Sequence, residues 1–252
     1  MFRIRVVRDP DEISRLIPEL AAVWAASESQ DVRAATEAKY RRASTDPQAP
    51  AFSAAVAQTS DGRVAGFRAG SLYTGDRSLW RDSFGGPLLV PRAGGMHAIS
   101  AATRERWADR PVPHGLAVAV HPEFKRQGLG REVTRAWGDG RPADEQYATG
   151  HIAPDNTASL ATFRSLGAQI IGTREDGRYF YLLPLRGQGP AEVDRQVAAI
   201  QRDAPGFDAA LGGLTAVPGR IPGTHATRAP EVALPIGRAV ERAAGLGRSL
   251  EK

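Results

Sequence analysis

A short basic segment with two glycines carries the clearest chemical signal in the chain. Residues 125–131 read KRQGLGR and lie between an alternating apolar run that ends at Pro122 and a helix-forming run that continues to Trp137. Glycines let the main chain approach an anion, and amides at a helix start point at it with the positive end of the helix dipole. The segment therefore predicts a phosphate-binding loop. A tight strand-to-helix connection that binds nothing is the structural alternative.

The sequence does not match two common classes of nucleotide-binding loop. No Gly-Lys-Ser/Thr follows the glycines, which excludes an ATPase P-loop. No third glycine follows Gly130 and no βαβ unit opens the chain, which disfavours a Rossmann dinucleotide site.

A second motif lies about thirty residues downstream, where residues 156–172 read NTASLATFRSLGAQIIG. Leu160, Phe163 and Leu166 share one face of a short predicted helix, which Gly167 ends before a strand. In this order and at this separation, the two segments resemble the GCN5-related N-acetyltransferase (GNAT) superfamily. Its signature is an (Arg/Gln)-x-x-Gly-x-Gly/Ala loop followed by Asn-x-x-Ala/Ser-x-x-x-Tyr/Phe-x-x-Leu-Gly-Phe.

The resemblance covers about three quarters of the chain and implies a fold and an activity. The fold would be α+β, with a mixed, mostly antiparallel central sheet of about seven strands flanked by helices, over residues 1–185. The activity would be transfer of an acetyl group from acetyl-CoA, a co-substrate, to the amine of a small molecule, with no metal. A long insertion at 73–113 would lie near the acceptor pocket, and residues 186–252 would form a C-terminal tail.

The resemblance also implies a set of residues that bind the coenzyme. The strand backbone would pair with the pantetheine arm, the loop amides would hold the pyrophosphate, and the later helix would contact the coenzyme. In that order the residues are Val118, Ala119 and Val120; Arg126, Gln127, Gly128, Leu129, Gly130 and Arg131; and Asn156, Ser159 and Phe163.

Three positions depart from the family pattern. Lys125 replaces Arg or Gln, which keeps the charge but not the forked geometry, and Ala168 replaces Phe. Phe163 stands where the family often has a tyrosine that protonates the departing thiolate. Water or another hydroxyl would then act as the acid, and Ser159, Tyr147 and Tyr73 are the candidates. Alternatively, the thiolate would leave unprotonated, which a thiol pKa near 8.5 permits.

His114 is the candidate catalytic base. It begins the strand before the loop, where histone-type members of the family carry a base glutamate, and an imidazole accepts a proton near neutral pH. His151 is the rival, and His121 and Glu123 are expected to be structural and solvated, respectively. A missing acid and an unsettled base favour an acceptor of low basicity, because an amine with a pKa near 7.7 is far more often neutral at pH 7 than one near 10.4.

The periodicity of the chain predicts the elements that carry these residues. Strands are expected at 2–7, 51–58, 63–72, 116–120, 147–152, 169–173 and 179–185. Helices are expected around 13–23, at 30–42, after the loop as far as Gly138, and at 157–166 and 191–202. A further helix is predicted at 96–107, whereas the Gly/Pro-rich stretch 206–230 is typical of a linker.

Composition narrows the class of protein. With no cysteine, there is no disulfide framework and no thiol nucleophile, and no run is long enough to cross a membrane. We therefore expect a cytoplasmic protein. The pI of about 9.9 comes from scattered arginines interleaved with acids and not from a stripe, which favours an anionic ligand over specific nucleic-acid binding.

Two alternatives keep the coenzyme site. One is a different reaction of an acyl-CoA, either transfer of a longer acyl group or decarboxylation with His114 as a catalytic group. The other is a non-catalytic acyl-CoA-binding module. The tail would dock on the domain or on the partner in a homodimer.

Overall fold

The structure is a computed structural model that describes residues 2–28, 32–45, 51–73, 89–92, 95–98, 111–174, 177–186 and 189–203. All of these residues belong to one compact unit, Met1–Val217. The predictions for 206–230 and for the end of the tail therefore lie outside the described residues.

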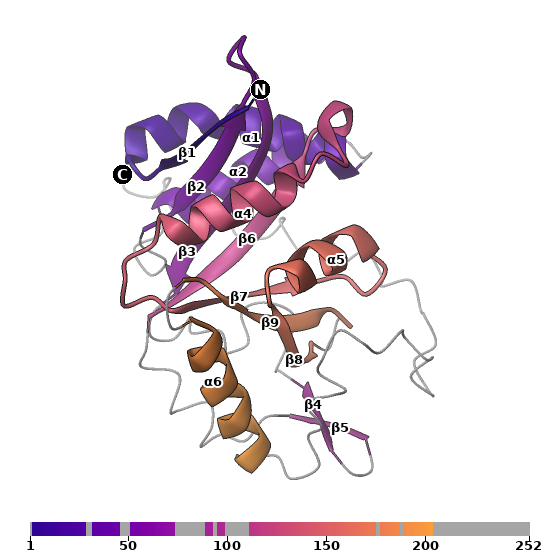
Figure 1. The fold of residues 1–252 in the computed structure, drawn as a ribbon. Helices are drawn as coiled ribbons and strands as arrows, with labels where there is room; N and C mark the ends of the chain where they lie inside the picture. Colours follow the sequence, from indigo (N-terminus) through magenta and orange to yellow (C-terminus); the bar gives the residue numbers. More distant parts are fainter. Residues whose placement is uncertain are drawn as a thin grey trace, which may run out of the picture. The chain divides into compact units, whose positions relative to one another are not determined.

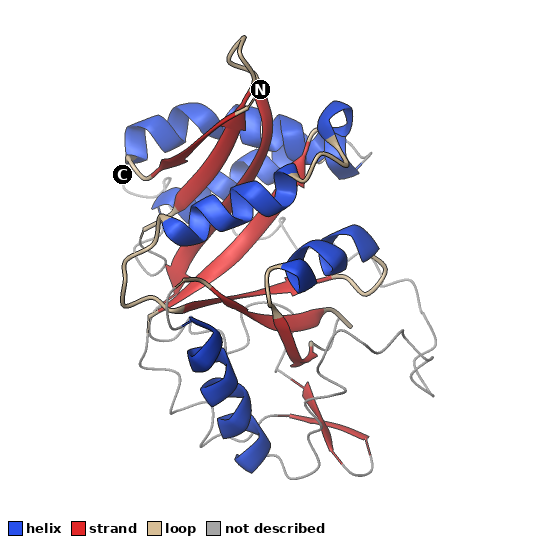
Figure 2. Ribbon diagram, in the orientation of Figure 1, coloured by secondary structure: helices blue, strands red, loops and turns tan. Residues whose placement is uncertain are grey.

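One mixed sheet organises the described chain. Its strands follow the order β1-β2-β3-β6-β7-β9-β8-β4-β5 (Figure 1 and Figure 2). Neighbours are antiparallel except for β6 and β7, which are parallel. The strands are β1 Arg3–Val7, β2 Ser53–Gln58, β3 Val64–Tyr73, β4 Leu89–Arg92, β5 Gly95–Ala98, β6 Val112–Val120, β7 Tyr147–Ile152, β8 Gln169–Thr173 and β9 Tyr179–Pro184.

Helices cover both faces of this sheet. α1 and α2 lie on one face, and α4 and α5 lie on the other (Figure 1). The helices are α1 Pro10–Glu28, α2 Arg33–Thr45, α4 Leu129–Asp139, α5 Thr157–Ser165 and α6 Gly189–Asp203.

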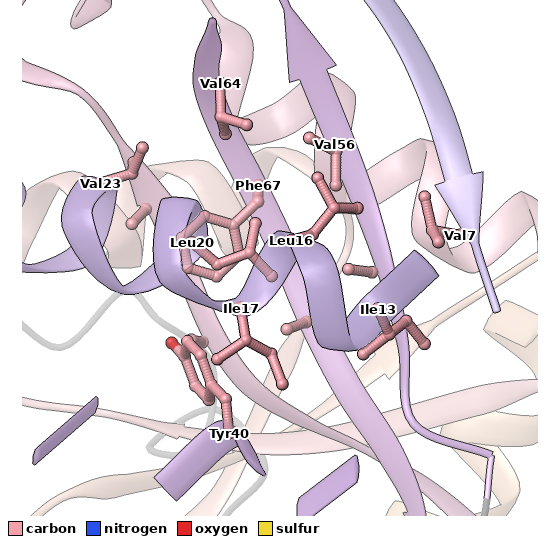
Figure 3. Packing of buried hydrophobic residues seen from close by; sticks show 14 of the residues in the cluster. Val7, Ile13, Leu16, Ile17, Leu20, Val23, Tyr40, Val56, Val64 and Phe67 are labelled. Atoms are coloured by element: carbon pink, nitrogen blue, oxygen red, sulfur yellow. The ribbon is translucent and has the colours of Figure 1, made fainter. Parts of the chain in front are cut away.

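The first face is held by the apolar stripe of α1. Ile13, Leu16, Ile17 and Leu20 recur at helical spacing and are buried against β2 and β3 (Figure 3). Each such side chain contributes roughly 1.5–3 kcal/mol when fully buried. This packing fixes α1 along the sheet and brings its C-terminal end, Glu28, close to the loop that follows β6.

The second face is held by α4. Leu129, Val133 and Trp137 lie one turn apart and are buried over alanines of β2 and β3. The Trp137 Nε1 donates to Ser53 Oγ at 3.0 Å, so the indole is both packed and hydrogen-bonded. Because α4 is held along its length, the position of its first turn beside the end of β6 is also fixed.

The fold class predicted from the sequence is confirmed, with two differences. The predicted helix at 96–107 is wrong at Met96–Ala98, which form part of β5; residues 99–110 lie outside the described residues. β4 and β5 form a hairpin that extends the sheet beyond β8, through the pair Leu89↔Thr173. Pairing at this sheet edge overrides local helix propensity, and it adds two strands to the seven expected.

The compact unit also extends past residue 185. α6 packs on β9 and β7, with Val193 and Val197 buried. The Gly189 amide donates to Arg186 O at 2.9 Å, which turns the chain into α6 directly after β9. The first part of the predicted tail is therefore a helix of the domain itself.

Candidate active site

β6 and β7 diverge in the middle of the sheet. β6 pairs with β3 from Val112 to Val120, but its described pairing with β7 is the single register position His114↔Thr149. The β3–β6 register shifts at Ala69/Gly70, which leaves Leu116 as an extra residue of β6. Beyond His114, backbone groups on one edge of β6 pair with none of the described strands and are available to a ligand with an extended, amide-bearing chain.

A pocket of ≈ 400 Å³ opens beside this divergence. Its wall comes from β6, the loop after it, the first turns of α4 and α5, and the end of α1. The lining residues are Ser27, Glu28, Val118, Ala119, Val120, Phe124, Lys125, Arg126, Gly128, Leu129, Gly130, Arg131, Asn156, Ala158, Ser159 and Thr162.

The loop has the backbone shape of an anion cradle. Arg126 and Gly128 both adopt left-handed conformations, with φ of 65° and 77°, and α4 begins at the next residue. Alternating left-handed residues turn successive amides to one side of the chain. No side chain caps α4, and the Arg131 amide donates to Gly128 O at 3.0 Å, so the amides of Leu129 and Gly130 are the ones at the helix start left for a ligand. The positive dipole end adds to the charges of Lys125, Arg126 and Arg131 there.

Lys125 also ties the loop to α1. Its Nζ donates to Ser27 O at 3.4 Å, at the C-terminal end of the helix. A cation is favourable at that end of a helix because the last carbonyls carry partial negative charge. Glu28, next in the chain, is the acidic residue of the described lining.

The start of α5 forms the opposite wall. Asn156 caps the helix, with Oδ1 accepting from the Ser159 amide at 3.0 Å. Asn156 therefore fixes the first turn of α5 and lines the pocket at the same time. Phe163 lies later in the same helix. It is fully buried in a cluster with Tyr181 and does not line the pocket.

The structure thus brings together ten of the twelve residues that the sequence assigned to the coenzyme; Gln127 and Phe163 are not among the lining residues. Sequence reasoning placed Lys125 in the loop without assigning it to the coenzyme, and it missed the contribution of Phe124, Ala158 and Thr162. Their positions next to or within the two motifs were a usable signal. The end of α1 was not predictable, since nothing in its sequence connects it to residue 125.

His114 lies at the point where β6 and β7 separate, but outside the pocket lining. It is fully buried, and its Nδ1 is 3.0 Å from Thr149 Oγ1, which in turn donates to Pro113 O at 3.2 Å. Burial, followed by the nearby charges of His151, Arg174 and Arg68, lowers the pKa of His114 well below 6.5. The imidazole is neutral at pH 7 and binds a proton weakly.

The other histidines differ in setting. The His151 ring lies 5.1 Å from that of His114, and burial together with Arg174 and Arg178 lowers the pKa of His151 to about 3. His121 precedes the loop, 3.7 Å from Glu123 Oε2. Tyr147, one candidate for the acid, lines a different pocket, and Tyr73 has no described side chain.

A buried arginine lies on the other side of the same point. Arg68 of β3 is 2 % exposed, and its Nη2 donates to the phenol oxygen of Tyr181 on β9 at 3.0 Å. The guanidinium lies 5.3 Å from the ring centre of Trp137 and 5.1 Å from that of Phe163. One feature of the sequence points to this residue, a charged side chain in the middle of the strand VAGFRAGSLY.

Metal and membrane signals are weak in the part of the chain that the structure describes. No cluster of three or more His, Cys, Asp or Glu side chains is placed to hold a metal ion within it. None of its helices has the length and apolar character that a membrane span requires.

Comparison with known proteins agrees with this geometry. Residues 109–176 match the family described as FR47-like protein, a GNAT-related family. That segment begins just before β6 and ends just after β8, so it contains the loop and α5. Over these residues the chain is therefore similar to a GNAT-related family. No curated protein sequence matches the chain significantly.

Solved structures of acetyltransferases are also similar at low identity. The ribosomal-protein-S18-alanine N-acetyltransferase of Escherichia coli is 15% identical with a TM-score of 0.46, over 74% of this chain and 96% of that one. The Salmonella typhimurium protein yncA, solved with its cofactor acetyl-CoA, is 19% identical with a TM-score of 0.42, over 74% and 95%. Naa20 of Chaetomium thermophilum, solved with a bisubstrate analogue, is 17% identical with a TM-score of 0.43, over 75% and 89%.

Proposed function

We propose that this protein is an acetyl-CoA-dependent N-acetyltransferase that acts on a small-molecule amine. The observation that carries the proposal is the pocket at the divergence of β6 and β7, where an anion cradle and an unpaired strand edge line the same cavity. The two features fit the two ends of one ligand. A diphosphate needs the amides of residues 126–131, and a chain with amide groups needs the backbone of Val118–Val120.

The shape of the pocket also implies how acetyl-CoA would be oriented in it. With the diphosphate at the start of α4 and the amide arm along β6, the thioester would lie toward the residues where β6 and β7 still pair. Attack by an amine then forms the C–N bond and expels the thiolate. The protein contributes by holding donor and acceptor in line and by stabilising charge as the C–S bond breaks.

The state of His114 constrains the acceptor. A neutral imidazole with a pKa well below 6.5 is a poor acceptor of the proton on a lysine-like ammonium, whose pKa is near 10.4. An amine that is already substantially neutral at pH 7 needs no strong base. The burial of His114 therefore supports an acceptor of low basicity, such as an α-type amine on a small molecule.

Thiol release tests the proposal. Acetyl-CoA is incubated with the protein and with a panel of amines whose pKa values run from about 7.7 to 10.4. We expect release that depends on the amine and favours the less basic members. A clear preference for lysine side chains would contradict the acceptor assignment. Release of CO2 from malonyl-CoA would instead support a decarboxylase, and binding without turnover an acyl-CoA-binding module.

A further inference from the structure

Arg68 and Tyr181 together span the point where β6 and β7 separate. In the strand order β3-β6-β7-β9, Arg68 reaches over Gly115 of β6, and Tyr181 reaches over Gly150 of β7. A Cβ atom at either glycine would collide with the guanidinium or with the phenol, respectively. Gly115 and Gly150 directly follow the register pair His114↔Thr149. We call this hydrogen-bonded pair of side chains the Arg68–Tyr181 bridge.

The bridge carries a positive charge that the protein does not neutralise. Among the described residues no carboxylate pairs with Arg68, and its Nε has no hydrogen-bond partner. Burying an ion without a counter-ion costs several kcal/mol. The rings of Trp137 and Phe163 recover part of this cost, but a cation–π contact is worth only about 0.5–2 kcal/mol.

The titratable groups around the bridge do not supply the missing charge. They are Tyr181 itself, the two histidines of β6 and β7, and the cations Arg174, Arg178 and Lys39, whose charges act on these histidines together with that of Arg68. Burial and the neighbouring cations, Arg68 among them, lower the pKa values of both histidines, so both are neutral at pH 7. α4 and α5 face the guanidinium with the rings of Trp137 and Phe163, which carry no charge.

The bridge adjoins the pocket through Val118, and neither Arg68 nor Tyr181 is itself among the lining residues. Arg68 is the register partner of Val118, which lines the pocket and also packs against the cluster that contains Phe163 and Tyr181. The Phe163 and Tyr181 rings lie 4.6 Å apart. The phenol oxygen accepts from Arg68, and its own hydrogen has no acceptor among the described residues. A hydroxyl is thus available close to the position where Phe163 lacks one.

We propose that Tyr181, held by Arg68, protonates the thiolate that leaves when the acetyl group is transferred. The inference rests on the proposed function. The amine nitrogen forms a bond to the thioester carbon, the C–S bond breaks, and its electron pair goes to sulfur. The phenol proton moves to sulfur and gives the free thiol of coenzyme A, while the guanidinium stabilises the phenolate. The amine loses its extra proton to solvent, and solvent returns one to the phenolate, so that charge and protons balance.

The acidity of the coenzyme A thiol in the complex tests this without knowledge of the acceptor. Coenzyme A is bound to the full chain, and its thiolate is followed by ultraviolet absorbance against pH, with desulfo-coenzyme A as the blank. A phenol O–H and a cation both favour the thiolate. We expect the thiol pKa in the wild-type complex to lie at least about one unit below that of free coenzyme A, and to return toward the free value in Tyr181→Phe and Arg68→Met.

Tyr179→Phe is the matched control, because Tyr179 lies on the same strand two residues away and is not bonded to Arg68. Its complex should titrate as the wild type does. An unshifted thiol in the wild-type complex overturns the inference, and so does a shift that survives Tyr181→Phe. If a variant does not fold, the wild-type value against free coenzyme A still decides. Failure of the wild type to bind coenzyme A refutes the proposed function instead.

Discussion

Two buried arginines lie against Trp137, each with its guanidinium 5.3 Å from the ring centre, and they differ in almost everything else. Arg141 forms an ion pair with Glu145, and its Nη1 donates to Ser53 Oγ at 3.2 Å. Arg68 has the phenol of Tyr181 and no carboxylate among the described residues. Arg141 is a structural cation at the end of α4, and its charge is paired with a carboxylate. The buried charge of Arg68 is only partly compensated.

The difference follows from position. Arg141 lies far along the chain from the loop, after α4 has ended, and its ion pair closes the turn toward β7. Arg68 lies opposite Val118, beside the cavity. A buried charge without a counter-ion, such as that of Arg68, lowers the stability of the folded protein. Stabilising the anion that develops during the reaction is a functional reason to retain it.

Replacing each arginine by methionine should separate the two roles most strongly. For Arg68→Met we expect turnover to fall between about 100- and 1,000-fold, because the field at the departing thiolate is lost. The free energy of unfolding should stay within about 1 kcal/mol of wild type or rise, because relief of a buried charge offsets the lost contacts. Arg68→Lys, which keeps the charge, should recover part of the rate. Steady-state kinetics and urea denaturation measure both quantities.

Arg141→Met should do the reverse. Removing one partner of a buried ion pair leaves Glu145 uncompensated and should lower the free energy of unfolding by about 3 kcal/mol. Turnover per folded molecule should stay close to wild type. Loss of stability in both variants, with equal turnover, would make Arg68 another structural cation and remove the contrast.

Tyr181→Phe removes a single oxygen atom from the Arg68–Tyr181 bridge and tests its contribution to the reaction. We expect kcat to fall by about 100-fold, at the low end for loss of a general acid, because a thiolate is a fair leaving group. KM for acetyl-CoA should change little, since the ring still packs on Phe163. The defect should shrink with the acetyl selenoester of coenzyme A, whose selenol leaves without a proton. Equal defects with both donors would assign Tyr181 to packing.

Gly115→Ala perturbs the bridge while leaving the charge in place. The new methyl would collide with the guanidinium of Arg68, which is confined between two rings. We expect about a tenfold loss of turnover from displacement of the guanidinium and a loss of about 1–3 kcal/mol in stability from overpacking. Gly138→Ala is the control, since its methyl would meet a flexible Leu185 side chain at 3.2 Å inside a helix. Wild-type turnover in Gly115→Ala would place Arg68 outside the reaction.

The smallest expected effect is the pH dependence of stability that comes from the two buried histidines, His114 and His151. Their pKa values are lower in the folded state than in the unfolded chain, so the unfolded state binds more protons below pH 6.5. Their contribution to stability is complete above pH 6.5 and is lost as the pH falls below that value, toward about 3 in the case of His151, by up to about 1.4 kcal/mol per pH unit for each histidine. Denaturation midpoints between pH 7 and 4.5 measure the slope. His114→Gln should flatten it; an unchanged slope in His114→Gln would contradict the assigned burial.

The parts of the site that sequence predicted are local in the chain. The loop at 125–131 and the α5 motif each carry their own glycine or cap signal, and the structure places both around one pocket. The Arg68–Tyr181 bridge joins residues 113 positions apart, and it exists because β3 and β9 flank the diverging pair β6 and β7. No local pattern encodes that juxtaposition. The burial of His114 likewise depends on β7, whose Thr149 and His151 lie against the imidazole, and not on its own strand.

Calorimetric titration with acetyl-CoA tests the central claim most directly, that the main-chain amides of residues 126–131 hold the diphosphate. Gly128 has a φ of 77° at the N-cap of α4, and Gly62 has a φ of 86° in the distant β2–β3 turn, so valine strains both positions alike. The account predicts measurable heat for the wild type and for Gly62→Val, and at least about tenfold weaker binding for Gly128→Val. No heat with folded wild-type protein, or equal affinity in all three, would contradict it.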